Sequence, residues 1–435
     1  MSSSIITIQL GQCGNQAGCA LFELLSKEYN NMKAEEEEWN RFFRAPINGS
    51  TLPTARSVLI DMEPKVIQQT TKSTRSFKYD PSRFYFKQSG SGNNWAFGYN
   101  VHGPASWDDG ISDLVRKEVE CCDCLGGFLF VQSLGGGTGS GLGTFTTNKF
   151  KEEYPNSMLI NQVVLPYSSG EVIVQNYNTL LSLSDLYAVS DAVILMENDQ
   201  LSRMCSELFS IKNPSFEDLN GVIADQLSNV LLPSNRSDNN RPLELWYDVI
   251  DYLCCHPNYR LLHLLSTPQV SQRSKAYSNF IWSNLVKNIN QMLITDAKMD
   301  AYINWGVTAA DAIKRPYLIN KSVGNILFLR GDDVQSVKED MIAPLTNQDI
   351  YCKFNYKNFM VCTNPQPNNG VTKCCSLLSN SQSVIQPIQR IINKASEMYQ
   401  SKAYLHQYEK YSVTADHFEH CMFQMDKVVY DYQSI

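Results

Sequence analysis

Residues 135–141 have the composition of a loop that binds an anion. They read Gly135, Gly136, Gly137, Thr138, Gly139, Ser140 and Gly141. Because glycine has no Cβ atom, its backbone can adopt positive φ and bring amide groups close to phosphate oxygens. A helix that begins after such a loop points its free N–H groups and the positive end of its dipole at the same anion. The sequence therefore predicts a phosphate-binding loop.

Two flanking segments would position this loop. The apolar run at 128–131 predicts a buried strand before it, and residues 142–154 predict a helix after it. A second strand-to-helix junction, at 11–18, follows an apolar strand predicted at 5–10. There Cys13 stands where the dinucleotide fingerprint G-x-G-x-x-G has its second glycine, and no lysine follows either loop as in a Walker A motif. A tight turn with no ligand remains the alternative for this second junction.

Two carboxylates follow a third predicted strand, at 58–60. Asp61 and Glu63 are separated by one residue, and carboxylate oxygens are ligands that Mg²⁺ accepts, directly or through water. The alternative is a polar strand exit without a metal.

The predicted strands alternate with helical patterns along the first half of the chain. Further apolar strands are predicted at 158–165 and 192–196. This β-α-β order predicts an α/β fold, a parallel sheet wrapped by helices, which is a Rossmann-like nucleotide-binding architecture. In such sheets ligands bind beyond the carboxyl ends of the strands, and every glycine- or acid-rich loop described so far leaves a strand at that end.

A buried helix is predicted after the first domain. Ser215 and Asp218 have the spacing of a capping box, and an apolar stripe continues from Leu219 to Val230 before Pro233. We therefore divide the chain into a nucleotide-binding domain at 1–214, a central helix at 215–233, an α/β intermediate domain at 234–380 and a C-terminal helical region at 381–435.

The composition excludes several classes of protein. The chain has 435 residues and a net charge of −7, which argues against general binding of nucleic acid. No apolar run reaches the length of a membrane span, and no secretory signal is visible at the N-terminus. The 13 cysteines lack the spacing of a disulfide framework and suit a reducing compartment. His417, His420 and Cys421 could share a helix face, where they would either bind a metal or line a packed surface.

The motifs together resemble the tubulin family. The similarity is carried by residues 11–16 and 135–141 and extends over the whole chain, including 61–64, 92–96, 166–178, 218–220 and 401–406. Within the family, residues 61–67, 98–104, 170–177 and 330–336 resemble the delta-tubulin subfamily most. The resemblance implies a tubulin-like fold that binds GTP or GDP with Mg²⁺.

The resemblance also implies roles for individual residues. The first loop, the phosphate loop and the serine before it would contact the nucleotide, and Asn93 would lie near the outermost phosphate. Glu63, with Asp61, would surround Mg²⁺, and Glu171 would lie near the ribose. Asn198 and Asn220 would read guanine, whose edge offers both acceptor and donor groups that an amide can meet. The residues implied in the loops are Gln12, Cys13, Gln16, Ser133, Gly135, Gly136, Gly137, Thr138, Gly139, Ser140 and Gly141.

For two of the residues to which the resemblance assigns a role, a purely structural role is the alternative. Phe216 matches an aromatic residue that stacks on the base, and the alternative is a core residue. Asp248 matches an acid that completes the GTPase site of a neighbouring subunit, and the alternative is a solvated helix residue. Asp is one methylene shorter than Glu, and Pro242, Leu243 and Leu245 replace polar residues of the family pattern, so hydrolysis in trans is in doubt.

The resemblance implies a GTP-binding protein of the microtubule cytoskeleton, located in the cytoplasm at centrioles and basal bodies, where it supports triplet microtubules and hence cilia and flagella. Its partners would be other tubulins, either alpha/beta or centriolar members, and microtubules. The alternative is a GTP-dependent regulator that never enters a polymer, since the chain lacks a Glu-rich C-terminal tail. A dehydrogenase is disfavoured by the absence of G-x-G-x-x-G and of a His-acid or Cys-His arrangement.

Overall fold

The chain folds into two compact units. The computed structural model describes residues 3–32, 36–47, 49–170, 172–275, 277–308 and 311–435. Unit 1 holds residues 1–199 and 386–430, and unit 2 holds residues 200–385 and 431–435. The four-part division made from the sequence stays a prediction.

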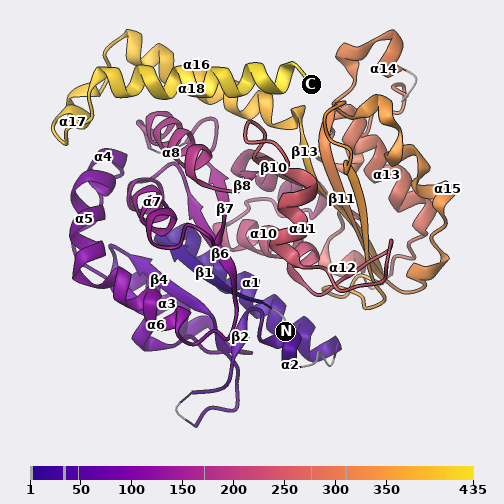
Figure 1. Cartoon of the computed structure of the whole chain (residues 1–435), viewed down its shortest axis with the longest axis horizontal. Helices are drawn as coiled ribbons and strands as arrows, with labels where there is room; N and C mark the ends of the chain where they lie inside the picture. Colours follow the sequence, from indigo (N-terminus) through magenta and orange to yellow (C-terminus); the bar gives the residue numbers. More distant parts are fainter. Residues whose placement is uncertain (1–2, 33–35, 48, 171, 276, 309–310) are drawn as a thin grey trace. The chain divides into compact units, whose positions relative to one another are not determined.

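Unit 1 is built on a six-stranded sheet in the order β5-β4-β1-β6-β7-β8 (Figure 1). Every neighbouring pair of these strands is parallel, so the predicted parallel sheet is confirmed. The strands are β1 (Ser4–Leu10), β4 (Ser57–Asp61), β5 (Phe84–Phe86), β6 (Leu125–Ser133), β7 (Met158–Leu165) and β8 (Ala192–Glu197). A separate two-stranded sheet pairs β2 (Phe43–Arg44) with β3 (Thr54–Ala55).

Helices cover both faces of this sheet. Ile8 and Leu10 share a hydrophobic core with Ile111, Val115 and Phe150, which come from the segments around α6 and α7. The helix α1 lies on the opposite face, because a Cβ at Gly18 would lie 2.4 Å from the side chain of Gln9. The helices are α1 (Gly11–Met32), α2 (Glu36–Trp39), α3 (Pro64–Ser73), α4 (Trp95–Phe97), α5 (Gly103–Ser106), α6 (Ser112–Val119), α7 (Gly143–Glu153), α8 (Gln175–Val189) and α9 (Asn198–Arg203).

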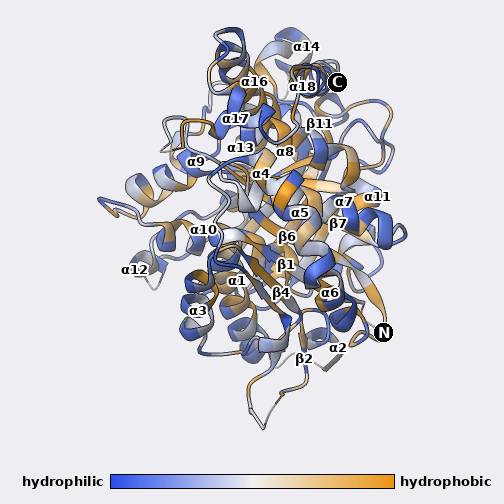
Figure 2. Cartoon of the chain, turned by 90° about the vertical axis from the view of Figure 1, so that its left-hand side faces the viewer, coloured by the Kyte–Doolittle hydropathy of each residue, from blue (hydrophilic) through white to orange (hydrophobic). Residues whose placement is uncertain are grey.

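The central strands are apolar because they are buried on both faces. All seven residues of β1 are buried, and Figure 2 shows β1, β4 and β6 in the colours of hydrophobic residues. Polar and glycine-rich loops then leave these strands at their carboxyl ends, with Gly11 after β1 and Ser133 as the last residue of β6. The sequence pattern thus places its candidate binding loops at one edge of the sheet.

The C-terminal helices α16 (Ile385–Gln400), α17 (Leu405–Glu409) and α18 (Ala415–Gln433) belong largely to unit 1. α16 and α18 lie side by side (Figure 1), and Tyr399 Oη donates to Glu419 Oε1 at 2.8 Å. α18 also contacts α8, because Ser184 Oγ donates to Gln424 Oε1 at 2.9 Å. No helix in the described part of the chain is long and apolar enough to cross a membrane.

Unit 2 combines a mixed sheet with helices. The order β10-β13-β11-β12-β9 contains one parallel pair, β11 with β12, and antiparallel pairs otherwise. Its strands are β9 (Asn235–Arg236), β10 (Leu261–Thr267), β11 (Ser322–Gly331), β12 (Phe359–Asn364) and β13 (Lys373–Ser381). Its helices are α10 (Phe216–Leu231), α11 (Leu245–Leu253), α12 (Gln272–Lys275), α13 (Trp282–Thr295), α14 (Asp311–Lys314) and α15 (Glu339–Ile342).

The helix predicted to begin after Ser215 is confirmed as α10, and its N-terminus carries the predicted capping box. Ser215 Oγ accepts from Asp218 N at 3.3 Å, and Asp218 Oδ2 accepts from Ser215 N at 2.8 Å. Leu219, Val222 and Ile223 of its apolar stripe are buried.

A buried histidine makes unit 2 sensitive to acid. His263 of β10 is 6% exposed, and neither ring nitrogen has a hydrogen-bond partner among the described residues. Burial, helped by the charge of Lys298, holds the pKa of His263 well below its usual range. The unfolded chain binds a proton at His263 below about pH 6.5 while the folded chain does not. This contribution to stability is therefore present above about pH 6.5 and lost as the pH falls.

We expect His263→Leu to weaken the acid dependence of stability. Between pH 6 and pH 5 the wild-type free energy of unfolding should fall by about 1.2 kcal/mol more than that of the variant. Urea unfolding at both pH values, at saturating nucleotide, measures the difference. His406→Leu, at an exposed position, is the matched control and should keep the wild-type slope. Equal slopes in wild type and His263→Leu would contradict the prediction.

Candidate nucleotide-binding site

The phosphate loop leaves four consecutive amides without a protein partner. β6 ends at Ser133, and a helical turn at Thr138–Leu142 leads directly into α7. In the part of the chain that the structure describes, the amides of Gly135, Gly136, Gly137 and Thr138 donate to no protein acceptor. Gly137 is buried and the other three residues are half-buried. Unpaired amides at a strand-to-helix junction favour a bound anion, since an N–H group shielded from water without an acceptor is costly. The predicted cradle therefore has the geometry of an anion site.

The glycines of this loop have two different roles. A Cβ at Gly137, Gly139 or Gly141 would lie 2.7, 2.6 or 2.2 Å from a backbone oxygen, of Ser91, Ser133 and Trp95 respectively. These three glycines are needed because the chain packs against itself. A Cβ at Gly136 would meet only Asn93 Oδ1, at 3.7 Å, which is ordinary contact. The space beside Gly136 is therefore open to a ligand.

The first loop contacts the phosphate loop. Gly11 has a φ of +69°, and its Cβ position lies 3.1 Å from Gly139 N, so this junction requires glycine. In the first turn of α1, Gln12 is exposed, and Cys13 and Gln16 are half-buried. Burial raises the pKa of Cys13 to about 12, although a hydrogen bond with Ser133 opposes the shift. The structure thus brings together the predicted residues of both loops.

Several predicted ligand-binding side chains have no protein partner, whereas their neighbours do. The side chains of Gln12, Gln16 and Asn93 make no hydrogen bond within the described residues. In contrast, Asn15 Nδ2 donates to Gly11 O at 2.9 Å and to Ile60 O at 3.1 Å. The side-chain amide of Asn15 therefore holds the fold together, and those of Gln12, Gln16 and Asn93 are free to bind a ligand.

Asn178 is a structural residue of the site that the sequence analysis did not identify. From α8, its Nδ2 donates to Asn93 O at 2.8 Å and to Gly135 O at 2.9 Å. Its Oδ1 accepts from Trp95 N at 2.9 Å and from Tyr408 Oη at 2.7 Å. Asn178 thus fixes the Asn93 loop against the phosphate loop.

We expect Asn178→Ala to lower GTP affinity about tenfold, a change of about 1.4 kcal/mol, because the two loops lose their common anchor. The variant also removes four hydrogen bonds, two of them buried, which should lower the melting temperature. Calorimetric titration with GTP measures the first effect. Asn148→Ala, which removes a single bond to Tyr99 Oη, is the control and should bind GTP normally. Normal affinity in Asn178→Ala would show that the two loops keep their positions without it.

The carboxylates predicted to surround Mg²⁺ fit that role. Asp61 is buried, its Oδ1 accepts from Glu63 N at 3.1 Å, and its Oδ2 has no partner among the described residues. Burial raises the pKa of Asp61 to about 6. Glu63 is exposed and makes no capping bond to α3. Asp61 and Glu63 could hold Mg²⁺ directly or through water, and the ion would offset phosphate charge.

Asn198 begins α9 directly after β8. Its side chain is half-buried and makes no hydrogen bond within the described residues. The next residue, Asp199, accepts from Ser168 N at 2.9 Å and so joins the loops that follow β7 and β8. Glu171, predicted near the ribose in the first of these loops, lies outside the described residues.

Comparison with known proteins agrees with this geometry. Residues 4–206 match the GTPase domain of the Tubulin/FtsZ family. The chain is 40% identical over 458 residues to the tubulin delta chain of Macaca fascicularis, with 99% of each chain covered. It is 38% identical to the delta chain of Homo sapiens over 99% of each, and 28% identical to the beta-1 chain of Glycine max over 99% of this chain and 94% of that one. The chain belongs to the tubulin family. A tubulin GTPase domain implies binding of GTP and GDP.

Two predicted residues of this tubulin-family chain lie beyond the matched GTPase domain, on α10 in unit 2. Phe216 is 57% exposed, so the alternative that it is a core residue is wrong. Asn220 follows one helical turn later, is buried, and makes no side-chain hydrogen bond within the described residues. Both side chains lie on α10 and are free to contact a ligand. Their contact with guanine stays a prediction.

Asp248 lies in α11 of the same unit and is 1% exposed, so it is not a solvated helix residue. Its Oδ1 accepts from Arg236 at 2.8 Å and from Arg241 at 2.7 Å, and its Oδ2 accepts from Glu244 N at 2.9 Å. The tubulin-family role of an acid acting on a neighbouring subunit stays a prediction. In this chain the carboxylate of Asp248 already forms ion pairs with Arg236 and Arg241.

Proposed function

We propose that this tubulin-family protein binds GTP and GDP at the carboxyl edge of the unit 1 sheet. The observation that carries the proposal is the run of four unpaired amides from Gly135 to Thr138, next to Asn93 and the first turn of α1. With no Walker lysine, the phosphates are held by amide dipoles, the N-terminus of the α7 helix and Mg²⁺ at Asp61 and Glu63.

We further propose a cytoskeletal role at centrioles and basal bodies, with other tubulins and microtubules as partners. The identity of 38–40% to several tubulin delta chains, against 28–29% to tubulin beta chains, supports this assignment. Tagged protein in ciliated cells should locate to centrioles, and loss of the protein should reduce triplet microtubules there. A diffuse cytoplasmic distribution with normal triplets would contradict this role.

A second candidate is a GTP-dependent regulator that does not enter a polymer. The burial of Asp248 between Arg236 and Arg241 favours it, because that carboxylate already accepts hydrogen bonds from two arginines of its own chain. Sedimentation with alpha/beta microtubules separates the two candidates. Pelleting in a fixed ratio to tubulin supports a lattice component, and a supernatant protein that still binds GTP supports the regulator.

The nucleotide released from freshly purified, denatured protein is the first test of the proposal. We expect GTP or GDP, identified by ion-exchange chromatography. Mostly GTP would indicate slow hydrolysis by the isolated protein, and mostly GDP would indicate hydrolysis in the cell. An adenine dinucleotide, or no nucleotide when Mg²⁺ is kept in all buffers, would overturn the assignment of the phosphate loop.

A further inference from the structure

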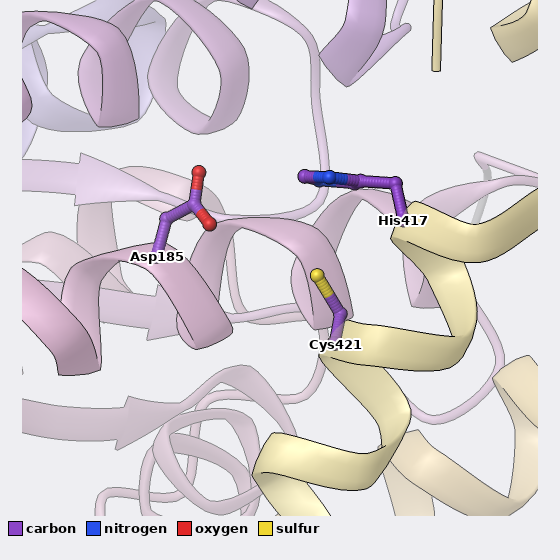
Figure 3. A group of neighbouring side chains, drawn as sticks. All are labelled: Asp185, His417 and Cys421. Carbon is purple, nitrogen blue, oxygen red and sulfur yellow. The ribbon is translucent and has the colours of Figure 1, made fainter. Parts of the chain in front are cut away.

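A group of three potential metal ligands, none of them assigned to the nucleotide, lies between α8 and α18. Asp185 comes from α8, and His417 and Cys421 come from α18 (Figure 3). One ligand atom from each residue lies within 4.8 Å of the other two. In the described part of the chain this is the one group of three or more His, Cys, Asp and Glu residues with such a geometry.

The backbone holds the three side chains in place. His417 and Cys421 are four residues apart on α18 and therefore project from the same helix face. α8 is fixed against this face, since Ser184 Oγ donates to Gln424 Oε1 at 2.9 Å and Gln424 Nε2 donates to Ser184 O at 3.3 Å. Figure 3 shows the carboxylate, imidazole and thiol directed toward a common point.

The hydrogen bonds of the protein leave two of these side chains unsatisfied. His417 Nε2 is buried and has no partner among the described residues. Asp185 is half-buried and makes no hydrogen bond or ion pair within the described residues. A desolvated carboxylate and an imidazole nitrogen without partners are costly, and a shared cation would remove both costs.

We propose that Asp185, His417 and Cys421 form a Zn²⁺ site that joins α18 to α8. The ligand set decides between metals, because one carboxylate, one imidazole and one thiolate suit zinc, whereas Mg²⁺ and Ca²⁺ require oxygen ligands. A tetrahedral zinc site with these bond lengths has ligand atoms about 3.5 Å apart, so each side chain needs to move inward by roughly 1 Å. Three protein ligands leave the fourth position to water.

Zinc binding releases one proton from the site. The Cys421 thiol loses its proton to solvent as sulfur bonds to Zn²⁺, and His417 binds through the lone pair of a neutral ring nitrogen. The ionised Asp185 carboxylate displaces water from the ion. The two positive charges of Zn²⁺ meet one thiolate and one carboxylate, so the occupied site is neutral.

One contact of a tryptophan ring with the cluster provides a spectroscopic probe. The ring of Trp95 lies 5.8 Å from that of His417, centroid to centroid. Co²⁺ takes the same tetrahedral ligands as zinc and adds visible and thiolate charge-transfer absorption. Its binding should therefore quench tryptophan fluorescence near the site.

The test is metal binding by full-length protein purified with its nucleotide. Chelator-treated protein is titrated with Zn²⁺ against a chromophoric chelator, and then with Co²⁺. We expect one tight zinc per chain, and Asp185→Asn, His417→Gln and Cys421→Ser should each lower zinc affinity at least about a hundredfold. The Co²⁺ thiolate band should be absent in Cys421→Ser.

Matched variants separate a metal site from a merely structural cluster. His420→Gln alters the exposed neighbour of Cys421, and Cys124→Ser alters an exposed thiol elsewhere, so both should bind zinc normally. Without metal, Asp185→Asn should match or exceed the wild-type melting temperature, because an unpaired carboxylate is removed. With Zn²⁺, the wild type alone should gain stability. GTP affinity should stay normal in Asp185→Asn, so failure here is distinguishable from failure of the proposed nucleotide site.

Zinc affinity that is equal in wild type and Asp185→Asn would overturn the proposal, because the carboxylate of α8 would not be a ligand. A Co²⁺ complex without a thiolate band, or a wild type that binds no zinc at micromolar concentration, would overturn it as well.

Discussion

Gly136→Val is expected to abolish GTP binding while leaving the fold intact. The Cβ of a side chain at this position meets only Asn93 Oδ1, at 3.7 Å, so the protein itself accommodates it. The added methyl groups instead occupy the space in front of the unpaired amides of Gly135 and Gly137. Phosphate oxygens must approach these amides to about 2.9 Å, which the methyl groups prevent. GTP affinity should fall at least about a hundredfold, a change of about 2.7 kcal/mol.

Gly137→Val is the comparison that makes this result interpretable. Its Cβ would lie 2.7 Å from Ser91 O and 2.8 Å from Asn94 N, so this variant displaces backbone. In nucleotide-free protein Gly137→Val should lower the melting temperature, and Gly136→Val should leave it close to that of the wild type. Calorimetric titration with GTP and thermal unfolding without nucleotide give the two quantities. Unchanged GTP affinity in Gly136→Val would show that this loop is not the phosphate site.

The sequence was sufficient to predict the parallel sheet of unit 1 and the loops that follow its strands. Strands such as β7, predicted at 158–165 and observed at Met158–Leu165, are continuous apolar runs, because both faces of the sheet are covered. The glycine loops were predictable for a similar physical reason. Gly11 at positive φ and Gly139 against Ser133 O occupy positions where a side chain does not fit. The local backbone geometry therefore requires glycine, and the glycines in the sequence indicate the loop.

The residues that depend on distant partners were not predictable in this way. Asn178 is a polar residue inside a helical pattern, and only the fold brings it to Asn93 and Gly135. The pair His417 and Cys421 was visible from its spacing, but Asp185 lies more than 200 residues earlier and carries no motif. Hydrophobic periodicity locates a helix and its buried face, but not which polar group of another helix meets it.

Asp248→Ala is expected to destabilise unit 2 by about 3–5 kcal/mol, the usual cost of breaking a buried ion pair on one side. Sequence comparison could align this acid with a catalytic position, but its burial depends on Arg236 and Arg241, which precede α11 in the chain. The variant leaves Arg236, whose side chain is 9% exposed, with Asp238 as its remaining acidic partner. It also removes the acceptor for Glu244 N at the start of α11. Chemical denaturation at saturating GTP measures the loss.

Glu244, which also forms an ion pair with Arg241, provides the control variant for Asp248. Glu244 accepts from Arg241 at 2.9 Å, but its side chain is largely exposed, so Glu244→Gln should change stability by less than about 1 kcal/mol. Hydrolysis of GTP, measured with and without alpha/beta-tubulin, then distinguishes the two roles of Asp248. If Asp248→Asn keeps wild-type stability and loses only the tubulin-stimulated hydrolysis, the carboxylate acts on a partner's nucleotide. If stability and activity fall together, Asp248 supports the fold, because its oxygens accept hydrogen bonds from two arginines and from Glu244 N instead of an attacking water.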